Sequence, residues 1–391
     1  MGADAGSAAA AAASAAREAL EAFGNTKPKL GLVFASVSYF DADSAARAVK
    51  AVVGDIPIVG GTSGAAVLGP SSVASRGVSV VLLGGDDLEV ATAAAELDSS
   101  ELVQVVPAAR EVAKAADDAA KRGFTFFSCL VFAPGIYTDG EALVAAVRKG
   151  LGARAQLAGG LTGDDLTMDR PRVFVRDELK HGQVVLAGLF TKKHVGISAR
   201  HGWRAVGPVR TVTRADGQKL LELDGRPALD VWLEDVKKAG GTLPKERKDL
   251  LVYLANHYEL ALTDSPTATE LVARAPWRIE DDGAVQLSGS IGEGRHVRLV
   301  HASRKDLLRA STNAASDAVL RAGSQVAGAL VFPCTGRIAC LGDDFPEEPR
   351  IIRERIAAPI GGACVFGEIA KTERDVDAFF NTTAVVVAFA A

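Results

Sequence analysis

The sequence predicts an α/β protein with mixed sheets and helices on their outer faces, built from repeated strand-helix-strand-strand units in two halves. The first observation behind this prediction is an apolar segment with paired glycines, which occurs at residues 57–64, 156–164 and 359–368. The second is an apolar Leu-Val-Phe triplet upstream of each copy, at residues 32–34, 130–132 and 330–332. An apolar, β-branched run follows each copy and predicts a closing strand for every unit.

Length and composition are those of a well-packed protein with more than one core. The chain has 391 residues, of which 48% are hydrophobic and 24% are charged. Because domains cluster around roughly 100 to 200 residues, two domains or a duplicated architecture are expected. The formal net charge is −4 with both signs interspersed. This balance gives no basic footprint, so nucleic acid is not expected as a partner.

Cysteine usage and hydropathy favour the cytoplasm. Four cysteines in a chain of this length make no disulfide framework, which is typical of a reducing compartment. No apolar run approaches the ~18 residues that cross a bilayer, so no membrane partner is expected. The first residues include Asp4 and no basic residue before the alanine run, which does not resemble a signal peptide.

The first half of the chain is expected to open with a helix. Residues 1–6 are expected to be disordered, and Ser7 to cap a helix that continues through the alanine tract and stops at Gly24. The first unit is predicted as a strand at 30–36, a helix at 41–53, a short strand at 57–59, and a strand at 77–84 antiparallel to that short strand. A connecting helix is predicted at 101–122. The second unit is predicted as a strand at 126–132, a helix at 139–149, and a closing hairpin of 173–176 with 183–190.

The second half is expected to combine hairpins with a third unit. The predicted elements are strands with turns at 212–217 and 220–225, a helix at 227–238, a charged loop at 240–248, a strand at 250–254, hairpins within 277–299, and a helix at 305–322. The third unit closes the chain, and residues 384–391 are apolar enough for a central strand. We therefore divide the chain into an alanine-rich N-terminal helix at 1–27 and two domains at 28–195 and 196–391.

The paired glycines, interpreted as turns, are the first candidate for a binding site. Glycine allows positive φ and close approach to backbone N–H groups, and both properties suit a loop that cradles a ligand. Tight turning alone also explains a single pair, but three equivalent turns favour a shared cavity. The candidate residues at these turns are Gly60, Gly61, Ser63, Gly159, Gly160, Asp164, Gly361, Gly362 and Glu368.

The acids that follow the second and third pairs suggest a ligand class. A carboxylate such as Asp164 or Glu368 can hold an ammonium group while nearby backbone amides hold a carboxylate. This combination points to a zwitterion such as an amino acid.

The loops after the first strands of the units are the second candidate. Strand ends that feed loops are where open α/β sheets bind ligands. The second unit offers Tyr137 and Asp139 there, and the third offers Cys334 and Arg337. Arg337 has a planar fork for a carboxylate and Tyr137 a rigid stacking surface. A surface ion pair for Arg337 and core packing for Tyr137 are the structural alternatives.

Other chemistries have weaker sequence support. Cys334 follows a strand and lies near Arg337, which would lower its pKa, but no local base accompanies it. Cys334 and Cys340 lack the paired spacing of a zinc site, and the six histidines show no metal-ligand spacing. Known nucleotide-binding loops are also absent from the sequence. These residues favour a binding protein over an enzyme, with no metal site.

Several motifs together resemble the FIST sensory domain family, with a FIST-N-like half at about 28–195 and a FIST-C-like half from 196 onward. The motifs that carry the resemblance are at residues 201–203, 212–217, 223–228, 334–337, 361–362, 367–368 and 380–383, the last of which contains Asn381. The glycine pairs at 60–64 and 159–164 look like the family's ligand-domain turns. We therefore add Asn381 to the candidate ligand-binding residues.

The resemblance implies a cytoplasmic sensor for a small ligand, with amino acids the usual suggestion. Family members occur alone or attached to output domains, and some bacterial ones look like haem-based nitric oxide sensors. No output segment remains after the two halves are counted, so signalling through a separate histidine kinase, cyclase or chemotaxis-type protein is expected. Haem is kept as an alternative cofactor, although no histidine here matches a family ligand.

Three hypotheses follow. The first is a binding module in which a ligand enters between the two halves and shifts them relative to each other. The second is a hydrolase or transferase that uses Cys334 or a carboxylate such as Asp164 or Glu368. The third is a scaffold whose surface carries the function.

Overall fold

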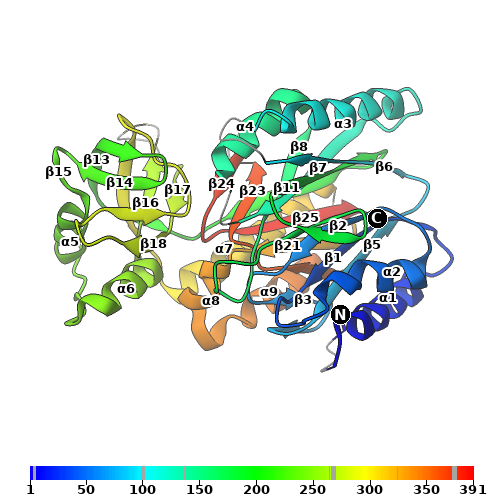
Figure 1. Ribbon diagram of the computed structural model, residues 1–391, viewed down its shortest axis with the longest axis horizontal. Helices are drawn as coiled ribbons and strands as arrows, with labels where there is room; N and C mark the ends of the chain where they lie inside the picture. Colours follow the sequence, from blue (N-terminus) through cyan, green and yellow to red (C-terminus); the bar gives the residue numbers. More distant parts are fainter. Residues whose placement is uncertain are drawn as a thin grey trace.

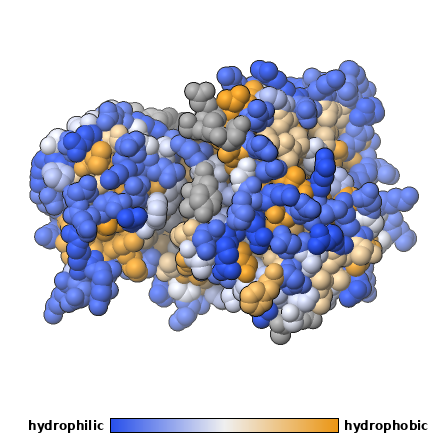
Figure 2. Space-filling model, viewed as in Figure 1, coloured by the Kyte–Doolittle hydropathy of each residue, from blue (hydrophilic) through white to orange (hydrophobic). Residues whose placement is uncertain are grey.

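The computed structural model describes residues 1–2, 6–97, 102–135, 138–263, 265, 270–323, 325–371 and 377–391. These residues form a large body and a smaller lobe (Figure 1). The lobe is residues 204–301, and the body is the rest of the described chain. The predicted α/β class with mixed sheets and helices is confirmed. Polar side chains cover much of both parts, with apolar residues in scattered groups between them (Figure 2).

Three units of the same order build the body, and each begins with a long helix. The first unit contains α1 (Ala8–Phe23), β1 (Pro28–Ala35), η1 (Ala42–Ser44), α2 (Ala45–Val53), β2 (Ile58–Thr62), β3 (Val67–Leu68), β4 (Val73–Ala74) and β5 (Val78–Gly84). The second contains α3 (Val105–Ala120), β7 (Phe126–Pro134), α4 (Gly140–Leu151), β8 (Gln156–Thr162), β9 (Val173–Val175), β10 (Glu178–Lys180) and β11 (Gln183–Thr191). The third contains α7 (Arg304–Ala322), β21 (Val326–Pro333), α8 (Thr335–Leu341), η3 (Gly342–Asp344), α9 (Glu347–Ile356), β22 (Ile360–Ala363), β23 (Gly367–Lys371), β24 (Asp377–Phe380) and β25 (Ala384–Ala390).

The alanine-rich helix is part of the first unit rather than an addition to it. Ser7 caps α1 and accepts a hydrogen bond from the N–H of Ala10, and Gly24 ends the helix, as predicted. α1 holds the same place in its unit as α3 and α7, because each helix directly precedes the first strand. The expected disorder is wrong for Gly2, whose N–H and C=O both pair with Val78 of β5.

Within each unit the first two strands are parallel, and the closing strand is antiparallel to the first. β1 pairs with β2, β7 with β8 and β21 with β22 in parallel, as expected for strands joined by a helical crossover. β5, β11 and β25 pair antiparallel with β1, β7 and β21. The prediction that residues 77–84 pair with the short second strand is therefore wrong, as is the hairpin of 173–176 with 183–190. β9 pairs with β10 and β2 instead.

The units exchange strands in a ring. The hairpin that follows the second strand of each unit pairs with the second strand of another unit: β3 with β22, β23 with β8, and β9 with β2. Two connecting strands add a further exchange, because β6 (Leu88–Glu96) pairs with β11 and β12 (Val195–Arg200) pairs with β25. Strands therefore cross the division between 28–195 and 196–391 in both directions, and that division stays a prediction.

The glycine pairs lie inside strands, which corrects their prediction as turns. Gly60, Gly159 and Gly362 belong to β2, β8 and β22 and have φ of 114°, 129° and 148°. A Cβ at each would lie 2.2 Å from the carbonyl oxygen of Val33, Val131 or Val331 in the adjacent parallel strand. The positive φ expected for these glycines is confirmed, but the group that lies close to them is the backbone of the neighbouring strand and not a ligand.

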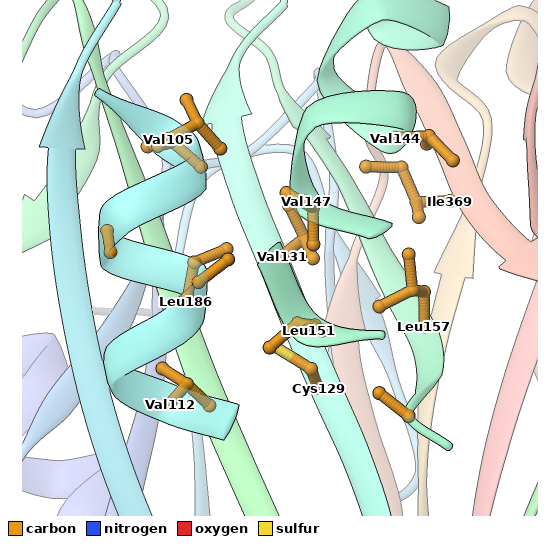
Figure 3. Close-up of a cluster of buried hydrophobic side chains, with 14 of the residues drawn as sticks. Val105, Val112, Cys129, Val131, Val144, Val147, Leu151, Leu157, Leu186 and Ile369 are labelled. Carbon is orange, nitrogen blue, oxygen red and sulfur yellow. The ribbon is translucent and has the colours of Figure 1, made fainter. Parts of the chain in front are cut away.

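The three Leu-Val-Phe triplets meet at the centre of the body. The rings of Phe34, Phe132 and Phe332 contact one another edge to face, with centroids 5.4, 5.8 and 5.6 Å apart. Helices cover the outer faces of the sheets. In the second unit, for example, Val105 and Val112 of α3 lie beside Leu186 of β11, and Val147 of α4 lies over Val131 of β7 (Figure 3).

The lobe is a mainly antiparallel sheet with its own core around the buried Trp232. It contains β13 (Arg204–Asp216), β14 (Lys219–Leu223), β15 (Arg226–Pro227), α5 (Ala228–Lys238), η2 (Arg247–Asp249), α6 (Leu250–His257), β16 (Tyr258–Thr263), β17 (Val272–Arg274), β18 (Pro276–Ile279), β19 (Val285–Leu287) and β20 (His296–His301). Residues 250–254 are helical, not a strand, since a short apolar run fits either conformation. β18 and β19 form the predicted hairpin, but β20 pairs with β13 and β16 rather than with β19.

Candidate functional site

A cavity of about 240 Å³ lies where the lobe leaves the body. The segment from Ala199 to Arg204, which connects β12 to β13, forms one wall, and Asp306 and Arg309 of α7 form another. Leu271 and Phe380 also line it. Strand β12 is fixed by pairing with β25, so the connecting segment is held against the start of α7.

Five charged side chains line this cavity: Arg200, Arg204, Glu270, Asp306 and Arg309. Arg204 Nη2 lies 2.6 Å from Asp306 Oδ2, and Arg309 Nη2 lies 2.7 Å from Asp306 Oδ1. Asp306 is buried and also completes a capping box with Ser303 at the start of α7. Burial raises the pKa of Asp306, but hydrogen bonds from Ser303 and Arg204 outweigh burial and hold the pKa below its usual value. The site therefore carries an ionised carboxylate beside two largely exposed cations.

Hydrogen bonds connect the cavity wall to both the body and the lobe. The indole Nε1 of Trp203 donates to Thr382 Oγ1 at 2.9 Å, and Thr382 Oγ1 donates to Glu259 Oε2 at 2.7 Å. Burial raises the pKa of Glu259 to about 8. His201 Nδ1 accepts the N–H of Trp203 at 2.9 Å, and burial together with Arg337 and Arg200 lowers the pKa of His201 to about 4.

Arg337 lies behind this wall, in helix α8 rather than in the predicted loop. Its guanidinium is fully buried and forms an ion pair with Glu348 at 2.6 Å. It also donates to the carbonyl oxygens of His201, Thr382 and Leu307, each at 3.0 Å. The planar fork predicted from sequence is thus used within the protein, in a buried ion pair that holds the cavity wall.

Cys334 and Glu368 are brought together in a second, fully buried polar group. The Cys334 thiol lies beside the Glu368 carboxyl group, whose Oε2 accepts the N–H of Thr383 at 3.0 Å. Within the described part of the chain, Glu368 Oε1 and both side-chain amide atoms of Asn381 have no hydrogen-bond partner. Burial raises the pKa of Cys334 and of Glu368 well above the usual values. The expectation of a lowered Cys334 pKa is therefore wrong.

The glycine pairs do not surround a common hollow. A Cβ at Gly61 or Gly160 would lie within 3.0 Å of neighbouring atoms, as at the positive-φ glycines, so strand backbone and side chains fill this space. Ser63 is buried after β2, where its N–H bonds to the carbonyl oxygen of Ala35. Gly361 lies elsewhere, on a groove beside β5.

The two remaining aspartates have structural contacts. Asp139 caps α4 and accepts a hydrogen bond from Ser290 of the lobe at 2.6 Å. Asp164 is buried and accepts hydrogen bonds from three consecutive N–H groups, those of Met168, Asp169 and Arg170. These bonds order the loop that leads to β9. Tyr137 lies outside the described residues.

Sequence reasoning missed the charged residues of the cavity. Arg204, Asp306 and Arg309 come from two segments a hundred residues apart in the sequence, and no local motif connects them. The only sequence signal was the Ser-x-x-Asp spacing at 303–306, which marks a helix start. The motif at 201–203, noted for its resemblance to a family, does line the cavity.

Comparisons with known proteins identify one family over nearly the whole chain. The FIST N domain family matches residues 29–226, and the FIST C domain family matches residues 228–371. FIST domains are sensory domains. A search of curated proteins found no match. Among the helices described here, none combines the length and apolar character needed to span a bilayer. The described residues also contain no cluster of three or more potential metal ligands.

Proposed function

Because the chain belongs to the FIST family, we propose that it is a cytoplasmic sensory protein that binds a small zwitterionic metabolite, an amino acid or a close analogue. The output passes to a separate signalling protein of the histidine kinase, cyclase or chemotaxis type. The ligand site proposed here is the cavity between residues 199–204 and α7, in place of the glycine pairs.

The observation that carries this proposal is the arrangement of Arg204, Asp306 and Arg309. Guanidinium groups bind carboxylates with directed, charge-assisted hydrogen bonds, so Arg204 and Arg309 suit the α-carboxylate of an amino acid. Asp306 and Glu270, which also lines the cavity, suit the ammonium group. The volume of about 240 Å³ is below the ~300–1,000 Å³ of pockets for drug-sized ligands, which favours a small metabolite.

The hydrogen bonds behind the cavity offer a route for the signal. Trp203 and Thr382 connect the cavity wall to Glu259 of the lobe. Thr382 has φ of 49°, a conformation that side chains other than glycine seldom adopt and that tends to occur at functional sites. A ligand that contacts both Arg204 and α7 favours one position of the lobe over others, and such differential binding is all that a sensor requires.

Haem fits this cavity poorly. His201 uses Nδ1 to accept the N–H of Trp203. A porphyrin is larger than a drug-sized ligand, and the cavity is smaller than pockets for such ligands. An absorption spectrum of the purified protein tests this alternative, because a Soret band would show that the chain binds haem.

The enzyme alternative loses support at its proposed nucleophile. An attacking cysteine must be a thiolate, whereas burial raises the pKa of Cys334. Glu368, which lies beside it, is also buried, and its pKa is raised as well.

A thermal-shift screen of the standard amino acids tests the proposed function. A ligand present at 100 times its Kd adds ~2.7 kcal/mol to the free energy of unfolding, which gives a measurable rise in Tm. We expect at least one amino acid to raise the Tm of the wild-type chain. No shift from any amino acid would count against the proposal.

A further inference from the structure

The three sheets of the body are equivalent except at one edge. The sheets of the second and third units each have six strands, and that of the first unit has five. In the second sheet β6 occupies the place beside the closing strand β11, and in the third β12 occupies the place beside β25. Beside β5, the closing strand of the first sheet, the corresponding place holds no strand of the described chain.

The connections show how this place would be filled. β6 follows β5 and joins the next sheet with Leu88 opposite Thr191, and β12 follows β11 with Val195 opposite Phe389. In both cases the added strand is antiparallel, and it begins opposite the end of the closing strand. In each case, the strand that follows the closing strand of one unit pairs with the closing strand of the next unit. By the same rule, a strand that followed β25 would pair with the free edge of β5. The last residues of β25 line the groove that runs along β5.

Backbone groups on the free edge of β5 are available for pairing. Gly2 donates to and accepts from Val78, so both polar backbone groups of Val78 point to this edge. Because residues alternate in an antiparallel ladder, the N–H and C=O groups of Val80 and Leu82 point to the same edge. β5 pairs with β1 on its other side. Beyond Val78, which Gly2 already pairs, the backbone groups of Val80 and Leu82 are therefore placed to pair with a short added strand.

The groove beside this edge is lined by β5, by α1 and by the end of β25. Its volume is about 520 Å³, and its lining includes Val81 and Leu83 of β5 and the alanines at 15, 19 and 22 of α1. In the two filled positions, large residues such as Leu88 or Ile197 face the central core. Small residues face the covering helix: Ala91 and Ala93 in β6, and Gly196 in β12, where a Cβ would lie 2.0 Å from the carbonyl oxygen of Ala318.

We propose that the edge of β5 is a docking site for an extended segment of a partner protein, which adds as an antiparallel strand and carries large apolar residues alternating with glycine, alanine or serine. The large residues face the core, and the small ones face α1. A second copy of this chain fits less well, since its own free edge presents Val80 and Leu82 on the helix side, where the filled positions have small residues. This site is separate from the amino-acid cavity, and each can fail without the other.

A synthetic peptide with the sequence of residues 192–200 tests the proposal, because it contains the strand that fills the equivalent place in the third sheet. We expect the labelled peptide to bind the full chain, measured by fluorescence anisotropy. Hydrogen exchange should become slower at Val80 and Leu82 but not along β25. A control peptide with Gly196→Leu and Ser198→Leu should bind at least tenfold more weakly.

Two matched protein variants locate the peptide. Ala22 is exposed on α1 and lines the groove, so Ala22→Trp should abolish binding by filling it. Glu21 is exposed next to it, outside the groove, and Glu21→Trp should bind like wild type. The proposal is overturned if the peptide does not bind, if the control peptide binds equally well, or if Ala22→Trp has no effect. A β5-paired dimer in sedimentation equilibrium that peptide does not dissociate would also overturn it.

Discussion

Trp203 donates its indole hydrogen to Thr382 Oγ1 at 2.9 Å, although the two residues lie at opposite ends of the C-terminal half. Thr382 passes the connection to Glu259, so a single hydroxyl bridges the cavity wall of the body and the lobe. A displacement of the connecting segment at 201–204 therefore changes contacts in both the body and the lobe.

Glu259→Gln should flatten the pH dependence of stability. Burial raises the pKa of Glu259 to about 8, so the folded state keeps a proton that the unfolded state loses near its ordinary pKa. This contribution to stability is fully present below the ordinary pKa and is lost as the pH rises through about 8. Glutamine still accepts the hydrogen bond from Thr382 but cannot ionise. In urea titrations from roughly pH 5 to 9, the wild type should lose up to ~1.4 kcal/mol per pH unit relative to the variant. Parallel pH profiles would refute this assignment.

Arg337→Ala should destabilise the chain strongly. The substitution leaves the buried carboxylate of Glu348 without its ion-pair partner, and such losses cost ~3–5 kcal/mol. Arg350→Ala is the matched control, because Arg350 pairs with Glu347 and Glu354 on the exposed side of α9 and its loss should have little effect on stability. Chemical denaturation measures both. Equal losses in the two variants would contradict the buried role of Arg337.

Gly362→Ala should also be costly. Gly362 has φ of 148°, and an added Cβ would lie 2.2 Å from the carbonyl oxygen of Val331. A strained backbone alone costs ~1–3 kcal/mol, and the contact with the adjacent strand adds to it. Gly328 lies in the same sheet, and the nearest atom to its Cβ position is 3.3 Å away, so Gly328→Ala should change stability by less than ~1 kcal/mol. A tolerated Gly362→Ala would mean that the glycine pairs are not needed by the strands.

Phe132→Ala should open the centre of the body. Its ring contacts Phe34 and Phe332 from the other two units, and truncation of a buried phenylalanine costs ~3–5 kcal/mol. The double variant with Phe332→Ala should be non-additive because the rings are in contact. Phe40 is fully exposed, so Phe40→Ala should fall within ~0.5 kcal/mol of wild type. Additive losses in the double variant would argue against a shared cluster.

The α/β fold class and the repeated unit could be predicted from the sequence, because both depend on local patterns. The Leu-Val-Phe triplets and the glycine pairs mark equivalent strands, and the helix caps at Ser7 and Gly24 are local signals. The sequence did not predict which strands of different units pair with each other. β23 pairs with β8, and β3 with β22, through contacts that no neighbouring residue specifies. The interpretation of the glycine pairs as turns was wrong for the same reason, since the strand that approaches each pair closely lies 27 to 31 residues upstream.

The site was predictable only in part. The 201–203 motif lines the cavity, and Cys334 and Glu368 do form a buried pair. The charged residues of the cavity are far apart in the sequence, because the whole lobe lies between residues 199–204 and α7. They come close together only in the folded chain. Arg337 is the opposite case. Arginine suits the carboxylate of a ligand, but Arg337 instead pairs with the internal carboxylate of Glu348. Its burial cannot be deduced from the neighbouring residues in the sequence.

The most direct test of the account is isothermal titration of the full chain with the amino acid that gives the largest thermal shift. We expect one ligand per chain for the wild type and for Arg304→Gln, which alters an exposed arginine outside the cavity. Arg309→Gln should bind about tenfold more weakly, equivalent to ~1.4 kcal/mol, through the loss of one charge-assisted contact. Absence of binding by any amino acid, or equal affinity of Arg309→Gln and the wild type, would contradict a zwitterion site between the lobe and the body.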